Sequence, residues 1–243
     1  MRFKWTIILF LFLIICQIET AKGQAKGEAA KKALHIVKIN RALLDSVSQL
    51  LVVFNGATDQ NTAVLVVMEK KNKNWQIKSD PFQVGIGRKG FAAPNAKREG
   101  DKKSPTGFYR LGQLFGYDKT VDTRMPYIQT TTDDKWIDDP GSADYNRYIR
   151  GVTQANSYEN LKIQGNDYKY CMVIEYNMHP VVKGYGSAIF LHLSEGDKPN
   201  PSSGCVVVTM GDMERLLKWM NPDSKPSILM GTEKVLMSGV PIR

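Results

Sequence analysis

Short apolar runs separated by polar turns dominate the chain from Gln49 onward. Some runs alternate apolar and polar positions with a period of two, as half-buried strands do, and others are continuously apolar, as in buried strands. The segments that we predict to form strands are residues 49–54, 62–68, 75–78, 82–87, 108–111, 170–176, 187–192, 206–208 and 226–230. Asn55-Gly56 and the polar stretch 70–74 supply turns. The sequence therefore predicts a mainly β fold with a few short helices.

Two segments carry apolar residues at helical spacing. Residues 24–45 are rich in Ala and Lys, with apolar residues three to four positions apart, and we expect an N-terminal helical extension there. Residues 210–220 form a second predicted helix, which ends before Pro222 because proline disfavours helical geometry in the residue before it. Residues 46–243 are then expected to form one domain, which is consistent with the length of the chain.

The longest region without a regular pattern covers residues 116–165. Its aromatic residues include Tyr127, Trp136, Tyr145 and Tyr148. Long ordered loops are commonly lids or binding loops, so these rings either wall a groove or pack as a small core beneath the loop. Asp138 and Asp139 are adjacent and would point to opposite faces of an extended chain, so we assign the pair no acid–base role.

Residues 1–23 have the pattern of a secretory signal peptide. Basic residues precede an apolar stretch over residues 6–15 that is too short to span a membrane comfortably, and residues 21–23 offer a cleavage site. A lipid anchor at Cys16 is disfavoured because the bulky Ile15 precedes it, and an uncleaved anchor is the remaining alternative. We therefore expect an exported protein of the periplasm or cell envelope, with no stable membrane insertion after cleavage.

The charge balance narrows the class of partner. The chain carries 33 Lys and Arg against 24 Asp and Glu, a formal net charge of +9. Such a surface suits polyanions. No nucleic-acid-binding module is recognisable and the lysines are scattered, so we expect no nucleic-acid partner. Two explanations of the positive charge remain: binding to a polyanionic cell wall, or a solvated surface without a specific partner.

Cysteine and histidine usage excludes several kinds of site. After signal removal only Cys171 and Cys205 remain, which is too few for a disulfide framework. The two either pair, as secreted cysteines can, or stay free. We favour free thiols, because Cys171 lies within an apolar strand whereas Cys205 follows a glycine turn. The three histidines are spread along the chain, so we predict no metal site and no cofactor.

The candidate chemistry begins at the end of the strand over residues 187–192. His192 ends that strand, and Ser202-Ser203-Gly204-Cys205 follows a polar, proline-rich loop. A thiol with a pKa of about 8.5 is mostly protonated at neutral pH, and a neighbouring imidazole can act as its base. Glycine allows close backbone approach. The N–H groups of Gly204 and Cys205 are the candidate oxyanion donors, with Ser202 and Ser203 in support.

Other residues are candidates for substrate contact. Arg98 and Lys102 lie in a basic, loop-like stretch over residues 89–104 and suit anionic groups. Tyr185 is flanked by glycines that would let it reach the site, and Tyr145-Asn146 lies in the aromatic-rich region. For each of these residues a solvated or structural role is the alternative.

Together these segments resemble the bacterial L,D-transpeptidase family. In that family a histidine precedes a Ser/Thr-His-Gly-Cys-hydrophobic-Arg/Asn element, which His192 and Ser202-Ser203-Gly204-Cys205-Val206 resemble. Ser104-Pro105-Thr106-Gly107-Phe108 is similar to the family's upstream TP-x-G-x-F element, and the resemblance covers about residues 46–231. Two positions depart from the pattern. Ser203 replaces the histidine of the element and Val207 replaces its Arg or Asn, so the chain resembles a divergent branch.

The resemblance implies a β-sandwich-like catalytic domain that cross-links peptidoglycan stem peptides. It implies that Cys205 forms a thioester with a donor tetrapeptide stem, that His192 moves the proton, and that carbapenem-type compounds are inhibitors. Three alternatives stay open. Water instead of an amine would make the same site an L,D-carboxypeptidase, and an incidental Cys205 would leave a non-catalytic envelope glycan-binding protein. A papain-type hydrolase is disfavoured because its cysteine precedes its histidine.

Overall fold

The computed structural model describes residues 21, 23–56 and 60–241, so the predicted signal peptide lies outside the described residues except for residues 21 and 23. A helix covers residues 23–39. The elements that follow are η1 (Arg41–Leu44), β1 (Gln49–Asn55), β2 (Thr62–Lys71), β3 (Asn74–Ile77), β4 (Phe82–Gly85), β5 (Gly107–Gly116), β6 (Tyr127–Gln129), β7 (Asp134–Ile137), β8 (Tyr148–Arg150), β9 (Tyr158–Asn160), β10 (Tyr170–Ile174), β11 (Phe190–Leu193), β12 (Val206–Val208), α2 (Met210–Trp219), η2 (Pro222–Ser224), β13 (Ser227–Thr232) and α3 (Glu233–Ser238).

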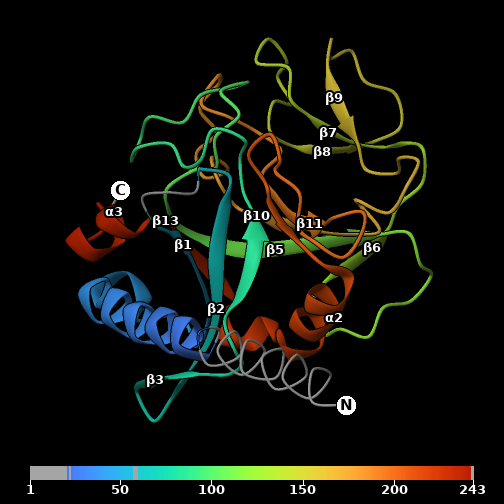
Figure 1. Cartoon of the computed structure of the whole chain (residues 1–243). Coiled ribbons are helices and arrows are strands. Elements are labelled where there is room, and N and C mark those ends of the chain that lie inside the picture. Colours follow the sequence, from blue (N-terminus) through green and yellow to red (C-terminus); the bar gives the residue numbers. More distant parts are fainter. Residues whose placement is uncertain (1–20, 22, 57–59, 242–243) are drawn as a thin grey trace, which may run out of the picture.

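The main sheet closes on itself as a barrel (Figure 1). Its strands run in the order β1-β13-β5-β10-β11-β12-β4-β2, and pairing of β2 with β1 completes the ring. The short strands β3 and β6 extend the sheet from β2 and β5. Closure pairs strand edges that would otherwise be exposed. The predicted mainly β class with few helices is confirmed, and the expected sandwich-like packing takes the form of this closed, strongly curved sheet.

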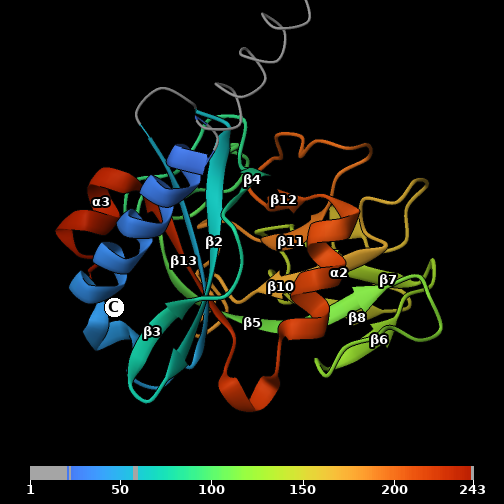
Figure 2. The ribbon, with the colours of Figure 1, turned by 60° about the horizontal axis from the view of Figure 1, so that its bottom comes forward.

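Strand β1 is buried on both faces, which explains its continuous apolar run. Leu51 and Val53 belong to the core inside the barrel, whereas Leu50 and Val52 pack outward in a second core with the N-terminal helix. Figure 2 shows that helix beside α3 on one flank of the barrel, with α2 on the other flank. Along the described residues, no helix is long and apolar enough to cross a membrane.

The region expected to be irregular contains strands β6 to β9, and three of these form a separate small sheet in the order β8-β7-β9. Two aromatic residues of this small sheet pack on the outer face of the barrel. Trp136 meets Phe190 edge-on at 5.3 Å, and Tyr148 lies 4.9 Å from Phe115. These rings therefore form a small core beneath the loop region. The sequence does not reveal these strands because three or four residues are too few to establish a period.

Asp134 is the ionic centre of the small sheet. Its fully buried carboxylate accepts hydrogen bonds from Arg150 Nε at 2.7 Å, from Thr131 N at 2.6 Å and from the Tyr148 hydroxyl. Burial acts to raise the pKa of Asp134, but the hydrogen bonds from Arg150, Tyr148 and Thr131 outweigh it and lower the pKa to about 2. The ionised carboxylate therefore anchors this sheet.

We expect Asp134→Asn to destabilise the protein by about 1–3 kcal/mol at neutral pH, because a charged acceptor of several hydrogen bonds is lost. A depressed pKa stabilises the fold above the ordinary value of 3.8, and that contribution disappears as the pH falls towards about 2. The variant should therefore lose less stability than the wild type across this interval. Urea unfolding at several pH values measures both effects. Asp133→Asn, at an exposed neighbouring position, is the control. If the free energy of unfolding of Asp134→Asn fell as steeply with decreasing pH as that of the wild type, this role of Asp134 would be contradicted.

Candidate active site

Cys205 and His192 project from the same outer face of the barrel. Strands β11 and β12 are parallel neighbours, with His192 opposite Val207 in the register. Leu191 and Val206 point into the barrel core, so alternation places His192 and Cys205 on the opposite face. Both residues line one cleft of about 400 Å³. The predicted pair is thus brought to a single cavity.

The upstream Ser-Pro-Thr-Gly segment packs directly behind the turn that carries the cysteine. The buried Ser104 hydroxyl donates to Gly204 O at 2.8 Å and accepts from Gly87 N at 2.9 Å. Gly204 has a φ of +154°, and a Cβ there would lie 3.0 Å from Lys103 O. A side chain at position 204 would force neighbouring backbone to shift. Two sequence elements that are distant along the chain therefore shape one turn.

The N–H of Gly204, one of the two candidate oxyanion donors, already has a hydrogen-bond partner within this turn. It donates to Ser202 Oγ at 3.0 Å, and that hydroxyl donates to Cys205 O at 2.7 Å. Ser202 therefore supports the turn. Ser203 is exposed and accepts from Arg88 Nη1 at 3.2 Å, which places a cation at the rim of the cleft.

The thiol of Cys205 is held by backbone groups that precede and begin β11. Its Sγ accepts from Phe190 N at 3.3 Å and donates to Ala188 O at 3.4 Å. The residue is only 8% exposed. Burial raises the pKa of Cys205 to about 12, although the Phe190 N–H and the charge of Lys97 act in the opposite direction. The resting thiol is therefore neutral.

The imidazole of His192 is held in one tautomer. Nδ1 lies 2.8 Å from Leu193 O, and because a carbonyl can only accept, Nδ1 carries the hydrogen and Nε2 keeps its lone pair. Burial lowers the pKa of His192, and the backbone carbonyls of Leu193 and Asp167 oppose this change. The ring of Tyr168 packs edge-on against it at 5.2 Å. Near neutral pH the imidazole is thus uncharged and able to accept a proton.

Side chains of both positive and negative charge line the cleft. Arg88, Lys97 and Lys102 line it together with Glu99, Asp138, Glu159 and Asp167. Burial raises the pKa of Glu159, and the nearby carboxylates of Asp138 and Glu99 act in the same direction. Sequence reasoning missed Arg88, Lys97, Glu159 and Tyr168. Lys97 lies in the basic stretch already noted, whereas Glu159 belongs to the small sheet and no local pattern links it to Cys205.

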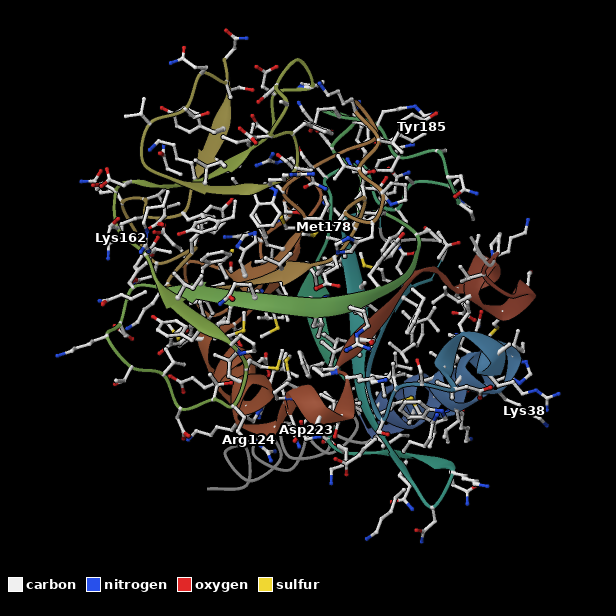
Figure 3. The ribbon with its side chains drawn as sticks, turned by 180° about the vertical axis from the view of Figure 1, so that it is seen from behind. Lys38, Arg124, Lys162, Met178, Tyr185 and Asp223 are labelled. Atoms are coloured by element: carbon white, nitrogen blue, oxygen red, sulfur yellow. The ribbon has the colours of Figure 1, made fainter. Side chains whose placement is uncertain are left out.

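The remaining predicted contact residues divide into three groups. Lys102 lines the cleft, as a substrate-binding residue must. Arg98 is exposed and stacks over Tyr185 at 4.0 Å, and neither is among the residues that line the cleft. Figure 3 shows Tyr185 at the end of the molecule opposite to Asp223. Tyr145 and Asn146 are 1% and 2% exposed, so their side chains present almost no surface to a substrate.

The side chains of Asp138 and Asp139 have different surroundings, as expected for adjacent residues on an extended chain. Asp138 lines the cleft, whereas Asp139 accepts from the backbone of Gly141 and Asn156. Cys171 and Cys205 are both free and buried. Within residues 21, 23–56 and 60–241, no three side chains of the types that bind metals gather closely enough to hold an ion.

Comparison with known proteins gives one family and one similar solved structure. The sequence profile of the YkuD family, described as the L,D-transpeptidase catalytic domain, matches residues 52–236. No curated protein sequence matches the chain. A crystal structure of the helical cell shape determining protein Pgp2 from Campylobacter jejuni is similar at 15% identity and a TM-score of 0.39, and it covers 83% of this chain and 54% of that chain. The chain thus spans about half the length of that protein.

Proposed function

Because the chain belongs to the YkuD family of L,D-transpeptidase catalytic domains, we propose that it is a cysteine acyltransferase acting on peptidoglycan stem peptides. One observation carries this proposal. Cys205 and a neutral, tautomerically defined His192 share one face of two neighbouring strands and one cleft. A nucleophile and an oriented base in one cavity suit acyl transfer. The proposed substrate and the expected signal peptide together favour action in the periplasm or cell envelope.

In the first step the Cys205 sulfur attacks the carbonyl carbon of the diamino-acid residue in a donor tetrapeptide stem. The thiol turns from Ala188 O, and Nε2 of His192 takes its proton as the S–C bond forms. The C–N bond to the terminal D-alanine then breaks, and the imidazolium returns the proton to the departing amine. The products are a thioester on Cys205 and free D-alanine.

The protonation state of the resting thiol determines when its proton moves in this step. A thiol whose pKa is about 12 does not ionise in advance, so proton transfer to His192 accompanies attack. Because the Gly204 N–H is engaged, the Cys205 N–H is the proposed oxyanion donor within the turn. Arg88, Lys97 and Lys102 offer positive charge to the carboxylate of the departing D-alanine.

In the second step an amine from an acceptor stem attacks the thioester carbonyl. The amine loses a proton, the new amide forms and the thiol of Cys205 is regenerated. The carboxylates of Asp138 and Glu159 on the cleft wall attract an ammonium group to this position. Attack by water instead would give the trimmed stem of an L,D-carboxypeptidase.

Product analysis of the purified protein with disaccharide tetrapeptides tests the proposal. Mass spectrometry should detect a cross-linked dimer together with released D-alanine. A tripeptide product without dimer would assign the carboxypeptidase reaction. If neither product forms, and no adduct appears on Cys205 with a carbapenem, the acyltransferase proposal is wrong and a glycan-binding role becomes the better explanation.

A further inference from the structure

Residues 184–188, which approach the cleft and end at the carbonyl beside the thiol, are held by three separate parts of the chain. Glu99 N donates to Gly184 O at 2.9 Å. Gly186 N donates to the Tyr145 hydroxyl at 3.0 Å, and Asn177 Nδ2 donates to Gly186 O at 2.8 Å. The Glu99 carboxylate also accepts from Ser187 Oγ at 2.7 Å. These contacts leave the segment little freedom to move.

Asn146 makes one more contact with this segment, at Ala188, whose carbonyl lies beside the Cys205 thiol. Its Oδ1 accepts from Ala188 N at 3.1 Å and from Trp136 Nε1 at 2.9 Å. Its Nδ2 donates to the carbonyls of Tyr176 at 3.0 Å and Asn177 at 2.8 Å. The amide is buried and both of its ends are engaged, so its orientation is determined.

Ala188 has a backbone conformation that its side chain disfavours. Its φ is +51°, in the left-handed region where a Cβ is crowded by the following carbonyl. Residues in such conformations persist only when their surroundings hold them, and they gather at functional sites. Here the Asn146 bond to Ala188 N holds the residue, and the Ala188 carbonyl accepts the hydrogen of the Cys205 thiol.

We propose that Asn146 is a positioning residue for the nucleophile. It holds Ala188 in the left-handed conformation in which the Ala188 carbonyl accepts the hydrogen of the resting Cys205 thiol and so fixes the position of the sulfur. The proposal rests on the proposed function for the role of Cys205. It replaces the substrate contact expected for Asn146 from the sequence, since the buried amide acts on the thiol through one backbone residue.

Loss of this contact should change two reactivities of Cys205 in opposite directions. A relaxed Ala188 no longer retains the thiol hydrogen, and the loosened segment admits water around a sulfur whose pKa burial otherwise raises. The thiolate fraction at a given pH then rises, by about tenfold for each unit by which the pKa falls. The same loosening misplaces the sulfur for attack on a bound donor, and a displacement of about 1 Å can cost about 100-fold.

The test compares Asn146→Ala with the wild type in two assays on the purified full chain. The rate of Cys205 alkylation by iodoacetamide, measured by mass spectrometry across pH, should increase about tenfold at neutral pH with a lower midpoint. Thioester formation with a tetrapeptide donor should fall by about tenfold to 100-fold. Parallel loss of both reactivities, or an unchanged alkylation profile, would overturn the proposal.

Two further variants separate positioning from general destabilisation. Trp136→Phe removes the other donor to Asn146 Oδ1 while sparing the Ala188 contact, so the alkylation profile should stay that of the wild type. Asn146→Ala combined with Ala188→Gly should recover donor acylation, because glycine adopts a positive φ without the asparagine. A folded double variant that fails to recover donor acylation would overturn the proposal. Altered alkylation in Asn146→Ala, with no acylation in the wild type, would refute only the proposed function.

Discussion

Replacement of Cys205 by serine should abolish acyl-enzyme formation while leaving the fold intact. The hydroxyl can retain the contacts with Phe190 N and Ala188 O, so the turn and the start of β11 lose little. A serine hydroxyl is a far weaker nucleophile in a site whose only proposed base is one neutral imidazole. We expect the acylation rate to fall by about 10⁴-fold to 10⁶-fold, the scale seen when an enzyme loses its nucleophile.

Intact-protein mass spectrometry with a tetrapeptide donor or a carbapenem measures this loss directly. Cys171→Ala is the matched control, because Cys171 is the other free, buried thiol and lies across from His192 in the pairing of β10 with β11. That variant should still form the adduct. An adduct on Cys205→Ser, or its disappearance only when Cys171 is replaced, would show that the nucleophile has been misassigned.

Replacement of His192 by glutamine should slow acylation by about 100-fold to 10⁴-fold, the usual contribution of a general base. Glutamine retains hydrogen-bonding capacity at this position but cannot accept the thiol proton. The pH profile carries the more specific signature. Because burial lowers the pKa of His192 below its ordinary 6.5, the neutral base persists above that depressed pKa and activity is lost only as the pH falls through it.

The wild type should therefore show an acid limb of kcat/KM that lies below pH 6.5, and His192→Gln should lack this limb. His35→Gln serves as the control, because His35 is exposed on the N-terminal helix. Its profile should match that of the wild type. If His192→Gln reacted at the wild-type rate, or kept the same acid limb, the base would have to be another group.

Local patterns in the sequence identified most of the barrel strands. The apolar runs at residues 49–54 and 62–68 correspond to β1 and β2, and the run at 206–208 corresponds to β12. Alternation also places His192 and Cys205 on one face once β11 and β12 are adjacent. These predictions succeed because period and turn chemistry depend on residues that are close along the chain. Strands β6 to β9 and helix α3 were not predicted, and all of them are short.

The candidate site was only partly predictable for the same reason. The sequence singled out Cys205, His192, Ser202 and Gly204 from a short motif. It did not predict that Gly204 N–H would be engaged by Ser202, or that Arg88, Lys97 and Glu159 would share the cleft. The charged residues come from different parts of the chain, and no pattern records which segments a closed barrel and a small sheet bring together.

By itself, the sequence determined the mainly β class and the family to which the chain belongs, and it singled out Cys205 and His192 as the residues now proposed to be nucleophile and base. Only the tertiary structure decided how the thiol is held and how far its pKa rises. Periodicity and motifs are local properties, whereas burial and hydrogen bonding depend on partners far along the chain. Asn146 and Ala188, 42 residues apart, meet only because the small sheet packs on the barrel beside Cys205.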